Sequence, residues 1–278
     1  MAIPEHLNVQ AALPSLEQDN RAKNPPWSLL TAVLTWIASV LLLFLPQVFA
    51  IPYIAMHYGS TPPTAETLLA NKTLVLILVA GVFPVHLLTL LLVWAIVSRF
   101  GKFSVVQTLG LTWNGKFTLA RSVGLAIALY VAAFVLTLAF GGQGTALDRL
   151  VESSRAAALM IAFLAVATAP IVEESIYRGI LYPAFERVAG PTVAVIVVTV
   201  LFALPHVPQY WPNFAVISSI TLLSVALTVL RARTGRLLPC IAVHLVFNGI
   251  QSVIIVVEPY LRHARPSGFI TQLLTCLH

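Results

Sequence analysis

The amino-acid sequence predicts an all-α membrane protein, a polytopic transmembrane helical bundle of about seven to eight membrane segments. Three observations predict this class: 59% of the 278 residues are hydrophobic, only 9% are charged, and the mean hydropathy is +0.92. Soluble globular proteins carry about 25% charged residues. A helix needs about 20 apolar residues to cross the hydrocarbon core of a bilayer, and several runs of this chain reach that length.

Seven apolar runs account for the predicted helices. They lie at about residues 28–50, 73–98, 119–140, 156–181, 191–205, 214–230 and 237–257. Pro46, Pro84 and Pro170 fall inside these runs, and proline usually kinks a helix, which membrane helices tolerate where neighbours re-satisfy the backbone. The fifth run is short and ends in Pro-His-Val-Pro, so the sequence leaves open whether residues 191–213 span the membrane fully.

The predicted chain has four parts. A polar cytoplasmic tail is followed by N-terminal transmembrane helices, core helices that carry polar motifs, and a C-terminal tail; these parts are residues 1–26, 27–155, 156–258 and 259–278. Neither Cys240 nor Cys276 has a partner at a spacing typical of zinc sites or disulfide frameworks. The formal charge of +6 is spread over short loops without a basic stripe, so we expect the lipid bilayer and not nucleic acid as a partner.

The distribution of basic residues predicts the orientation, because lysine and arginine collect in cytoplasmic loops. The side of the N-terminal tail has eleven: Arg21, Lys23, Arg99, Lys102, Lys116, Arg121, Arg178, Arg187, Arg231, Arg233 and Arg236. The other side has five: Lys72, Arg149, Arg155, Arg262 and Arg265. We therefore expect an integral multi-pass protein with a cytoplasmic N-terminus. The side of the C-terminus stays open, because the fifth run is short.

Polar groups inside membrane spans are functional candidates, because an unpaired ionisable group there costs several kcal/mol. The chain has few such groups: Glu173, Glu174, Arg178, His206, His244 and His86, with Asn248 as a polar companion. We expect His86 to be a packing residue or a hydrogen-bonding residue between helices.

The two adjacent glutamates are expected to have different roles, since neighbouring helical residues point about 100° apart. Glu174 and Arg178 are spaced i, i+4 with the acid first, the favourable order for a helical ion pair. Glu173 has Tyr177 at i+4 and no basic residue on its own ridge. Glu173 is therefore the freer carboxylate and the better candidate for a catalytic base.

A predicted helical hairpin brings Glu173 and His206 to the same depth. Gly190 lies in a predicted turn, and Glu173 is 17 residues before it while His206 is 16 residues after it. Two antiparallel helices with equal rise place these positions side by side. His244 and Asn248, spaced i, i+4, present one face of the last helix to the bundle interior.

The expected depths of His244 and Glu173 in the membrane do not agree. His244 is expected about 12 Å from the preceding basic loop, whereas Glu173 is expected about 24 Å from the hairpin turn. We therefore expect the tip of the hairpin, which is broken by Pro183 and carries Glu186 and Arg187, to project beyond the lipid.

A carboxylate and an imidazole that share a water molecule can act as a general base, and nearby histidine and asparagine donors can stabilise an oxyanion. This set suits a peptidase without a serine or cysteine nucleophile. The same groups could bind a divalent metal such as zinc, although the H-E-x-x-H signature is absent. Two alternatives are a proton-coupled transporter, which also uses buried Glu and His, and a non-catalytic membrane immunity or scaffold protein.

Three ordered motifs resemble those of the CPBP family, the CAAX proteases and bacteriocin-processing enzymes that include the Ras-converting CAAX endopeptidases and the abortive-infection proteins. The E-E-x-x-x-R motif resembles Glu173 to Arg178, the F-x-x-x-H motif resembles Phe202 to His206, and the H-x-x-x-N motif resembles His244 to Asn248. Together the motifs cover roughly residues 156–257, and the first three apolar runs carry no motif.

The resemblance implies an intramembrane endopeptidase. It implies that Glu173 and His206 activate water, that His244 and Asn248 support the oxyanion, and that the remaining pair, Glu174 and Arg178, holds the helices in place. Both a metalloprotease and a metal-free glutamate mechanism are proposed for the family, so the metal stays undecided. The implied partner is a peptide or protein substrate, membrane-anchored or prenylated in eukaryotic members and varied in bacterial ones.

Overall fold

The computed structural model describes residues 25–59, 63–113, 115 and 117–264. Several sequence predictions lie outside these residues: those on the tail up to residue 24, on Lys116, and on Arg265 and Cys276 near the C-terminus. For Arg262 only the backbone is described.

Helices make up the regular structure of the described residues, as the sequence predicted. They are α2 (Leu29–Leu42), α3 (Leu45–Tyr58), α4 (Ala65–Ala70), α5 (Lys72–Ala80), α6 (Val82–Ser98), α7 (Val105–Leu109), α8 (Leu119–Phe140), α9 (Ala146–Ser153), α10 (Arg155–Phe163), η1 (Leu164–Thr168), α11 (Ala169–Glu174), η2 (Ser175–Leu181), α12 (Tyr182–Ala203), η3 (Leu204–His206), α13 (Val207–Tyr210), α14 (Phe214–Thr234) and α15 (Leu238–Ala264).

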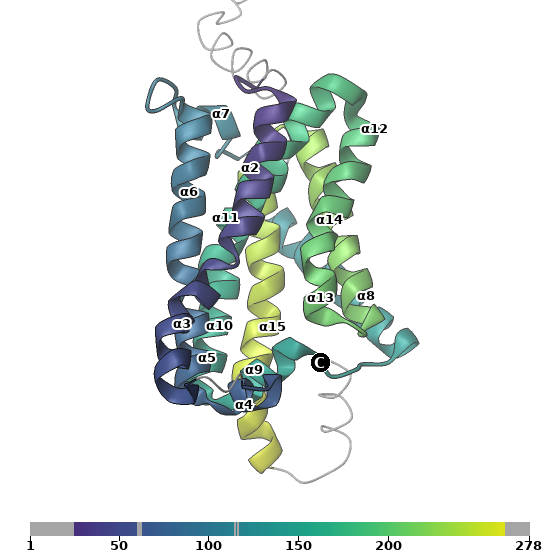
Figure 1. Cartoon of the computed structure of the whole chain (residues 1–278). Helices are drawn as coiled ribbons and strands as arrows, with labels where there is room; N and C mark the ends of the chain where they lie inside the picture. The colour runs from purple at the N-terminus through teal and green to yellow at the C-terminus, as the bar shows by residue number, and fades with distance from the viewer. Residues whose placement is uncertain (1–24, 60–62, 114, 116, 265–278) are drawn as a thin grey trace, which may run out of the picture.

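Six helical stretches of the described chain are long and apolar enough to cross a membrane. They are Leu29–Tyr58, Lys72–Ser98, Leu119–Phe140, Arg155–Tyr210, Phe214–Thr234 and Leu238–Val257. The fourth stretch is a hairpin, because Gly190 has φ 81° and ψ 167°, a conformation that glycine adopts without strain. Its two arms, counted separately, correspond to the fourth and fifth predicted runs (Figure 1). The predicted polytopic bundle is confirmed.

Local sequence explains where several helices begin. The side chains of Ser28, Ser154 and Asn213 each accept a hydrogen bond from a backbone N–H in the first turn of the helix that follows. Pro46 and Pro170 lie at the second residue of α3 and α11, where a backbone N–H has no intrahelical partner to lose. The apolar runs are thus divided into shorter helices at these positions.

The two ends of the bundle differ in composition. One end, here called the basic end, comprises residues 25–28, 99–113, 117–121, 186–191 and 231–238, and its segments are joined by side-chain contacts. Arg187 donates hydrogen bonds to the carbonyl oxygens of Pro25 and Trp27, and Arg236 donates one to Thr112 Oγ1. The opposite end, here called the α9 end, comprises residues 63–72, 141–155 and 207–213 (Figure 1).

The turns at the basic end lie at different heights. A Cβ atom at Gly179 would lie 3.0 Å from Leu109 Cδ2 and 3.5 Å from Leu237 Cδ2, so Gly179 is level with the start of α15. Gly190 is eleven residues further along, or about 16 Å at the helical rise. The hairpin therefore extends past the α14–α15 turn, which removes the mismatch in depth between Glu173 and His244. Projection of its tip beyond the lipid stays a prediction.

A buried apolar cluster fills the half of the bundle nearest the basic end. Its members are Trp27, Ala32, Val93, Val97, Leu109, Ile176, Tyr177, Ile180, Leu181, Tyr182, Ala184, Ala194, Val198, Phe202 and Leu237. The Trp27 indole N–H also donates a 3.1 Å hydrogen bond to the carbonyl oxygen of Ile180. Because these residues come from α2, α6, α7, η2, α12 and the segments just before α2 and α15, the cluster connects the hairpin to the rest of the bundle.

Candidate active site

The Glu174–Arg178 pair forms the buried base of the site. Both side chains are fully buried, and Arg178 Nη1 lies 3.0 Å from Glu174 Oε1. Arg178 also donates through Nε to Thr228 Oγ1 and through Nη2 to the carbonyl and hydroxyl oxygens of Ser224. The expected ion pair is present. Through the hydrogen bonds of Arg178 it links the helix formed by α11 and η2 to α14.

His244 lies between the two glutamates. Its Nδ1–H donates to Glu174 Oε1 at 2.8 Å, and its Nε2 is 3.8 Å from Glu173 Oε2. Glu174 therefore has two partners, whereas the sequence analysis assigned it only Arg178. The Glu173 side chain keeps 27% of its surface exposed, so this carboxylate is accessible, whereas the Glu174 side chain is fully buried.

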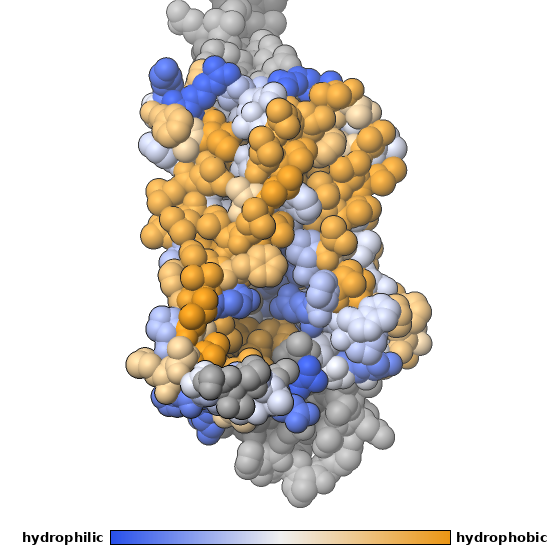
Figure 2. Space-filling view, viewed as in Figure 1, coloured by the Kyte–Doolittle hydropathy of each residue, from blue (hydrophilic) through white to orange (hydrophobic). Residues whose placement is uncertain are grey.

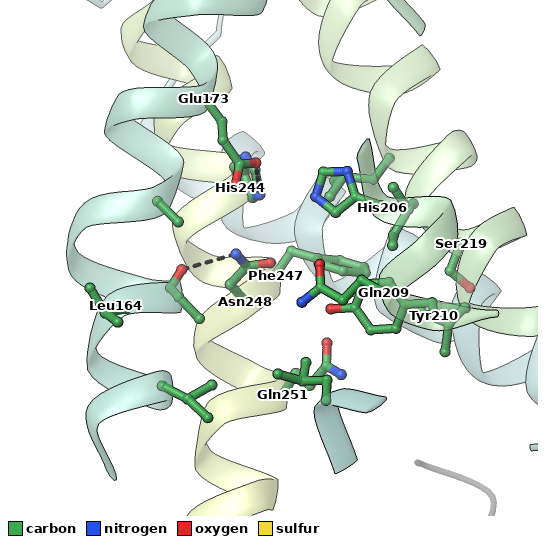
Figure 3. A pocket seen from close by; sticks show the side chains of 18 of the residues that line it. Leu164, Glu173, His206, Gln209, Tyr210, Ser219, His244, Phe247, Asn248 and Gln251 are labelled. Atoms are coloured by element: carbon green, nitrogen blue, oxygen red, sulfur yellow. Dashed lines mark hydrogen bonds and ion pairs between the residues drawn. The ribbon is translucent and has the colours of Figure 1, made fainter. Parts of the chain in front are cut away.

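His206 faces Glu173 across a cavity (Figure 3). The His206 ring stacks on Phe202 with centroids 5.0 Å apart, and His206 Nδ1 donates a 2.7 Å hydrogen bond to the Phe202 carbonyl oxygen. With Nδ1 protonated, the Nε2 atom of a neutral ring is a hydrogen-bond acceptor. The ring is therefore held by its own helical turn in a defined orientation and tautomer.

Asn248 lies one helical turn beyond His244 on α15. Its Nδ2 donates a 2.9 Å hydrogen bond to the carbonyl oxygen of Ala165 in η1. An amide nitrogen carries two hydrogens, so one N–H remains for another acceptor. The structure thus brings Glu173, His206, His244 and Asn248 to one place.

The cavity has a volume of about 420 Å³, within the range typical of small-molecule and peptide sites. Its walls are mainly apolar and include Leu164, Leu223 and Phe247. The four candidate residues line it, and Figure 3 shows Gln209, Tyr210 and Gln251 on its walls as well.

Several polar residues of the cavity were not predicted to belong to the site, among them His86, Gln209, Tyr210 and Gln251. His86 Nδ1 lies 2.7 Å from Thr168 Oγ1, so the expected hydrogen bond between helices is present, but the ring also lines the cavity. Two of the others follow a helical period from known candidates, Tyr210 at i+4 from His206 and Gln251 at i+3 from Asn248. This helical spacing was the feature of the sequence that could have predicted Tyr210 and Gln251 as residues of the site.

The described residues do not assemble a metal site. Zinc in a catalytic site needs three protein ligands, and no group of three His, Cys, Asp or Glu side chains of the described chain is arranged to hold a metal ion. Both nitrogens of His244 are directed at carboxylates, and His206 Nδ1 is bonded to a backbone carbonyl. The donor set does not fit a three-ligand centre.

Comparison with known protein families gives a match to one segment of the chain. Residues 155–250 match the family model described as Type II CAAX prenyl endopeptidase Rce1-like. No curated protein and no solved structure matches the chain. The matched segment begins at the start of α10 and contains all four candidate residues.

Proposed function

We propose that this chain is a glutamate-type intramembrane endopeptidase of the CAAX protease family, a proposal that the match of residues 155–250 to the Rce1-like family model supports. One observation carries the proposal: Glu173, His206 and His244 lie on three helical segments and line a single, mostly apolar cavity. Glu173 is the accessible one of the two glutamates, and no basic residue lies one helical turn away on its own ridge. Its carboxylate is therefore available to take a proton.

The proposed reaction needs only water and the peptide. Water lies between Glu173 and His206 Nε2, and Glu173 accepts its proton as the oxygen attacks the carbonyl carbon of the scissile bond. The remaining N–H of Asn248 donates to the oxyanion of the tetrahedral intermediate, and the Nε2–H of His244 does the same when that ring carries a proton on both nitrogens. When the C–N bond breaks, the proton passes from Glu173 to the departing nitrogen, so the products are a carboxylic acid and an amine, which exchange a proton to become a carboxylate and an ammonium group.

The buried pair has a positioning role in this proposal. Glu174 holds His244 through its Nδ1–H, which directs Nε2 toward Glu173. Arg178 holds Glu174 and is itself anchored on Ser224 and Thr228 of α14. Each of these contacts is a hydrogen bond to a buried group. The position of His244 beside the Glu173 carboxylate therefore depends on how the helix that carries Glu174 and Arg178 packs against α14 and α15.

Loss of the His206 imidazole tests the proposed water activation. We expect His206→Ala to lower the rate of peptide hydrolysis by about 10²–10⁴-fold, the range typical of a general acid or base. The measurement uses purified full-length protein in detergent, a peptide library, and mass spectrometry of the products. His57→Ala is the matched control, since His57 is exposed at the end of α3. Equal cleavage by both variants would reject the role of His206.

Metal removal separates the glutamate mechanism from a metal mechanism. We expect protein dialysed against a strong chelator to retain its hydrolysis rate within about twofold, because no step of the proposed reaction uses a metal ligand set. Elemental analysis of the same sample gives the metal content. A rate that falls with chelation and returns when zinc is added back would contradict the glutamate-type assignment.

A further inference from the structure

We infer that the active-site cavity is entered from the α9 end, which lies on the extracytoplasmic face of the membrane. The substrate is then a peptide segment exposed on that face. The identity of the bound molecule as a substrate rests on the proposed function, whereas the direction of access does not.

The basic residues indicate which end is cytoplasmic. Among the described residues, the basic end carries seven lysines and arginines and the α9 end carries three. The seven are Arg99, Lys102, Arg121, Arg187, Arg231, Arg233 and Arg236, and the three are Lys72, Arg149 and Arg155. Short loops rich in these residues remain in the cytoplasm during membrane insertion. The α9 end therefore faces away from the cytoplasm.

Packing closes the route from the basic end to Glu173. The residues that follow Glu173 toward the hairpin turn are buried continuously from Glu174 to Ala184. They pack with Trp27, Leu109 and Leu237 in the apolar cluster described above. Protein interiors of this kind hold few voids larger than a water molecule, so a peptide has no path through this half.

The cavity extends from Glu173 in the opposite direction. Its lining includes residues of α9, α13, the first half of α14 and the second half of α8, and no residue of the basic end lines it. A small adjoining cavity shares Leu147, Tyr210 and Gln251 with it and reaches Thr145 and Asp148 at the α9 end. Figure 2 shows hydrophilic residues along the upper rim and a hollow, with hydrophilic residues around it, in the lower half.

A second approach to Glu173 is narrower. A cavity of about 170 Å³ shares Glu173, His86 and His206 with the main one and is bounded by Ser39 of α2 and by Leu43, which follows α2. Because α2 carries exposed apolar side chains along its length, a molecule entering here would come from the lipid. The main cavity is more than twice as large and bears more polar groups, which favours the route from the α9 end.

The lining indicates the kind of peptide that the cavity accepts. Glu173 is the only Asp, Glu, Lys or Arg side chain among the residues that line it. Asn248, Gln251 and Gln209 can bond the polar groups of an extended backbone, and the apolar walls suit uncharged side chains.

Cysteine labelling tests the direction of access without any need for activity. In a full-length background with Cys240→Ala and Cys276→Ser, a single cysteine is placed by Gln251→Cys in the cavity or by Gln107→Cys, the matched control, on the exposed surface of α7 at the basic end. Right-side-out and inside-out vesicles of a bacterial host are treated with a membrane-impermeant maleimide. We expect the Gln251→Cys protein to be labelled at least about tenfold faster in right-side-out vesicles, and the Gln107→Cys protein in inside-out vesicles.

Each other labelling pattern contradicts the inference. Labelling of the Gln251→Cys protein from the same side as the control would place the opening on the cytoplasmic face, and no labelling from either side would mean that the cavity is closed to water.

A cleavage assay separates this inference from the proposed function. An impermeant fluorogenic peptide is added to both vesicle types, with Glu173→Gln vesicles as the blank. Cleavage of this peptide only in inside-out vesicles would mean that the active site opens to the cytoplasmic face. That result would overturn this inference but not the proposed function. No cleavage in either vesicle type or in detergent would overturn the proposed function and leave the labelling result standing.

Discussion

Glu173→Gln is expected to lower the rate of peptide hydrolysis by at least about 10²–10⁴-fold, the contribution of a positioned general base. Glutamine has nearly the same shape as glutamate but cannot accept the proton of the attacking water. The Glu173 carboxylate is partly exposed, and the His244 ring lies 3.8 Å from it. Its replacement should therefore leave the packing of the helices unchanged.

The assay compares Glu173→Gln with Glu152→Gln, the same substitution at an exposed position of α9. Product formation is followed by mass spectrometry, and thermal unfolding in detergent is measured on the same preparations. We expect equal unfolding temperatures and a loss of activity in Glu173→Gln alone. A Glu173→Gln protein that keeps a third or more of the rate would remove Glu173 from the mechanism.

Arg178→Met is expected to reduce the free energy of unfolding by about 3–5 kcal/mol, the usual cost of removing one partner from a buried ion pair. Arg178 and Glu174 are both fully buried, so the Glu174 carboxylate would lose its guanidinium partner without gaining water. Ser224 and Thr228 would each lose a charge-assisted hydrogen bond as well.

Denaturant-induced unfolding in detergent micelles measures this loss. Arg233→Met is the matched control, because Arg233 is exposed on α14, and it should change the free energy of unfolding by less than about 0.5 kcal/mol. The double variant Glu174→Gln/Arg178→Met should recover part of the loss, because a neutral amide costs less to bury than a carboxylate. If the double variant is no more stable than Arg178→Met, a buried charge is not the cause. This comparison remains available if Arg178→Met alone cannot be purified.

Much of the fold could be predicted from local patterns. The apolar runs correspond to the membrane-spanning helical stretches because the length needed to cross a bilayer is a property of consecutive residues. The turn at Gly190 was predicted from its composition, and the structure has a positive φ there. One boundary was wrong: the first predicted helix ends at about residue 50, whereas α3 continues to Tyr58. The last predicted run, 237–257, agrees with the apolar stretch Leu238–Val257, although α15 itself continues to Ala264. Helix ends of this kind depend on tertiary contacts as well as on hydropathy.

Local spacing along the chain also predicted part of the candidate site. Equal spacing of Glu173 and His206 from Gly190 predicts their common depth, since both arms of a hairpin rise equally. The structure places both residues on one cavity. The participation of His86 and Gln209 in that cavity was missed, because hydropathy and spacing do not report how a helix is rotated about its axis.

The sequence by itself determined that this chain crosses the membrane several times, which carboxylate is paired along its own helix, and which glutamate and histidine share a depth. These properties follow from composition, helical rise and i, i+4 spacing. Only the tertiary structure decided that His244 bonds Glu174, that Asn248 bonds the Ala165 carbonyl, and that the cavity is closed toward the basic end. Those features depend on the relative height and rotation of helices far apart in the chain, and these are set by side-chain packing between helices rather than by any local pattern.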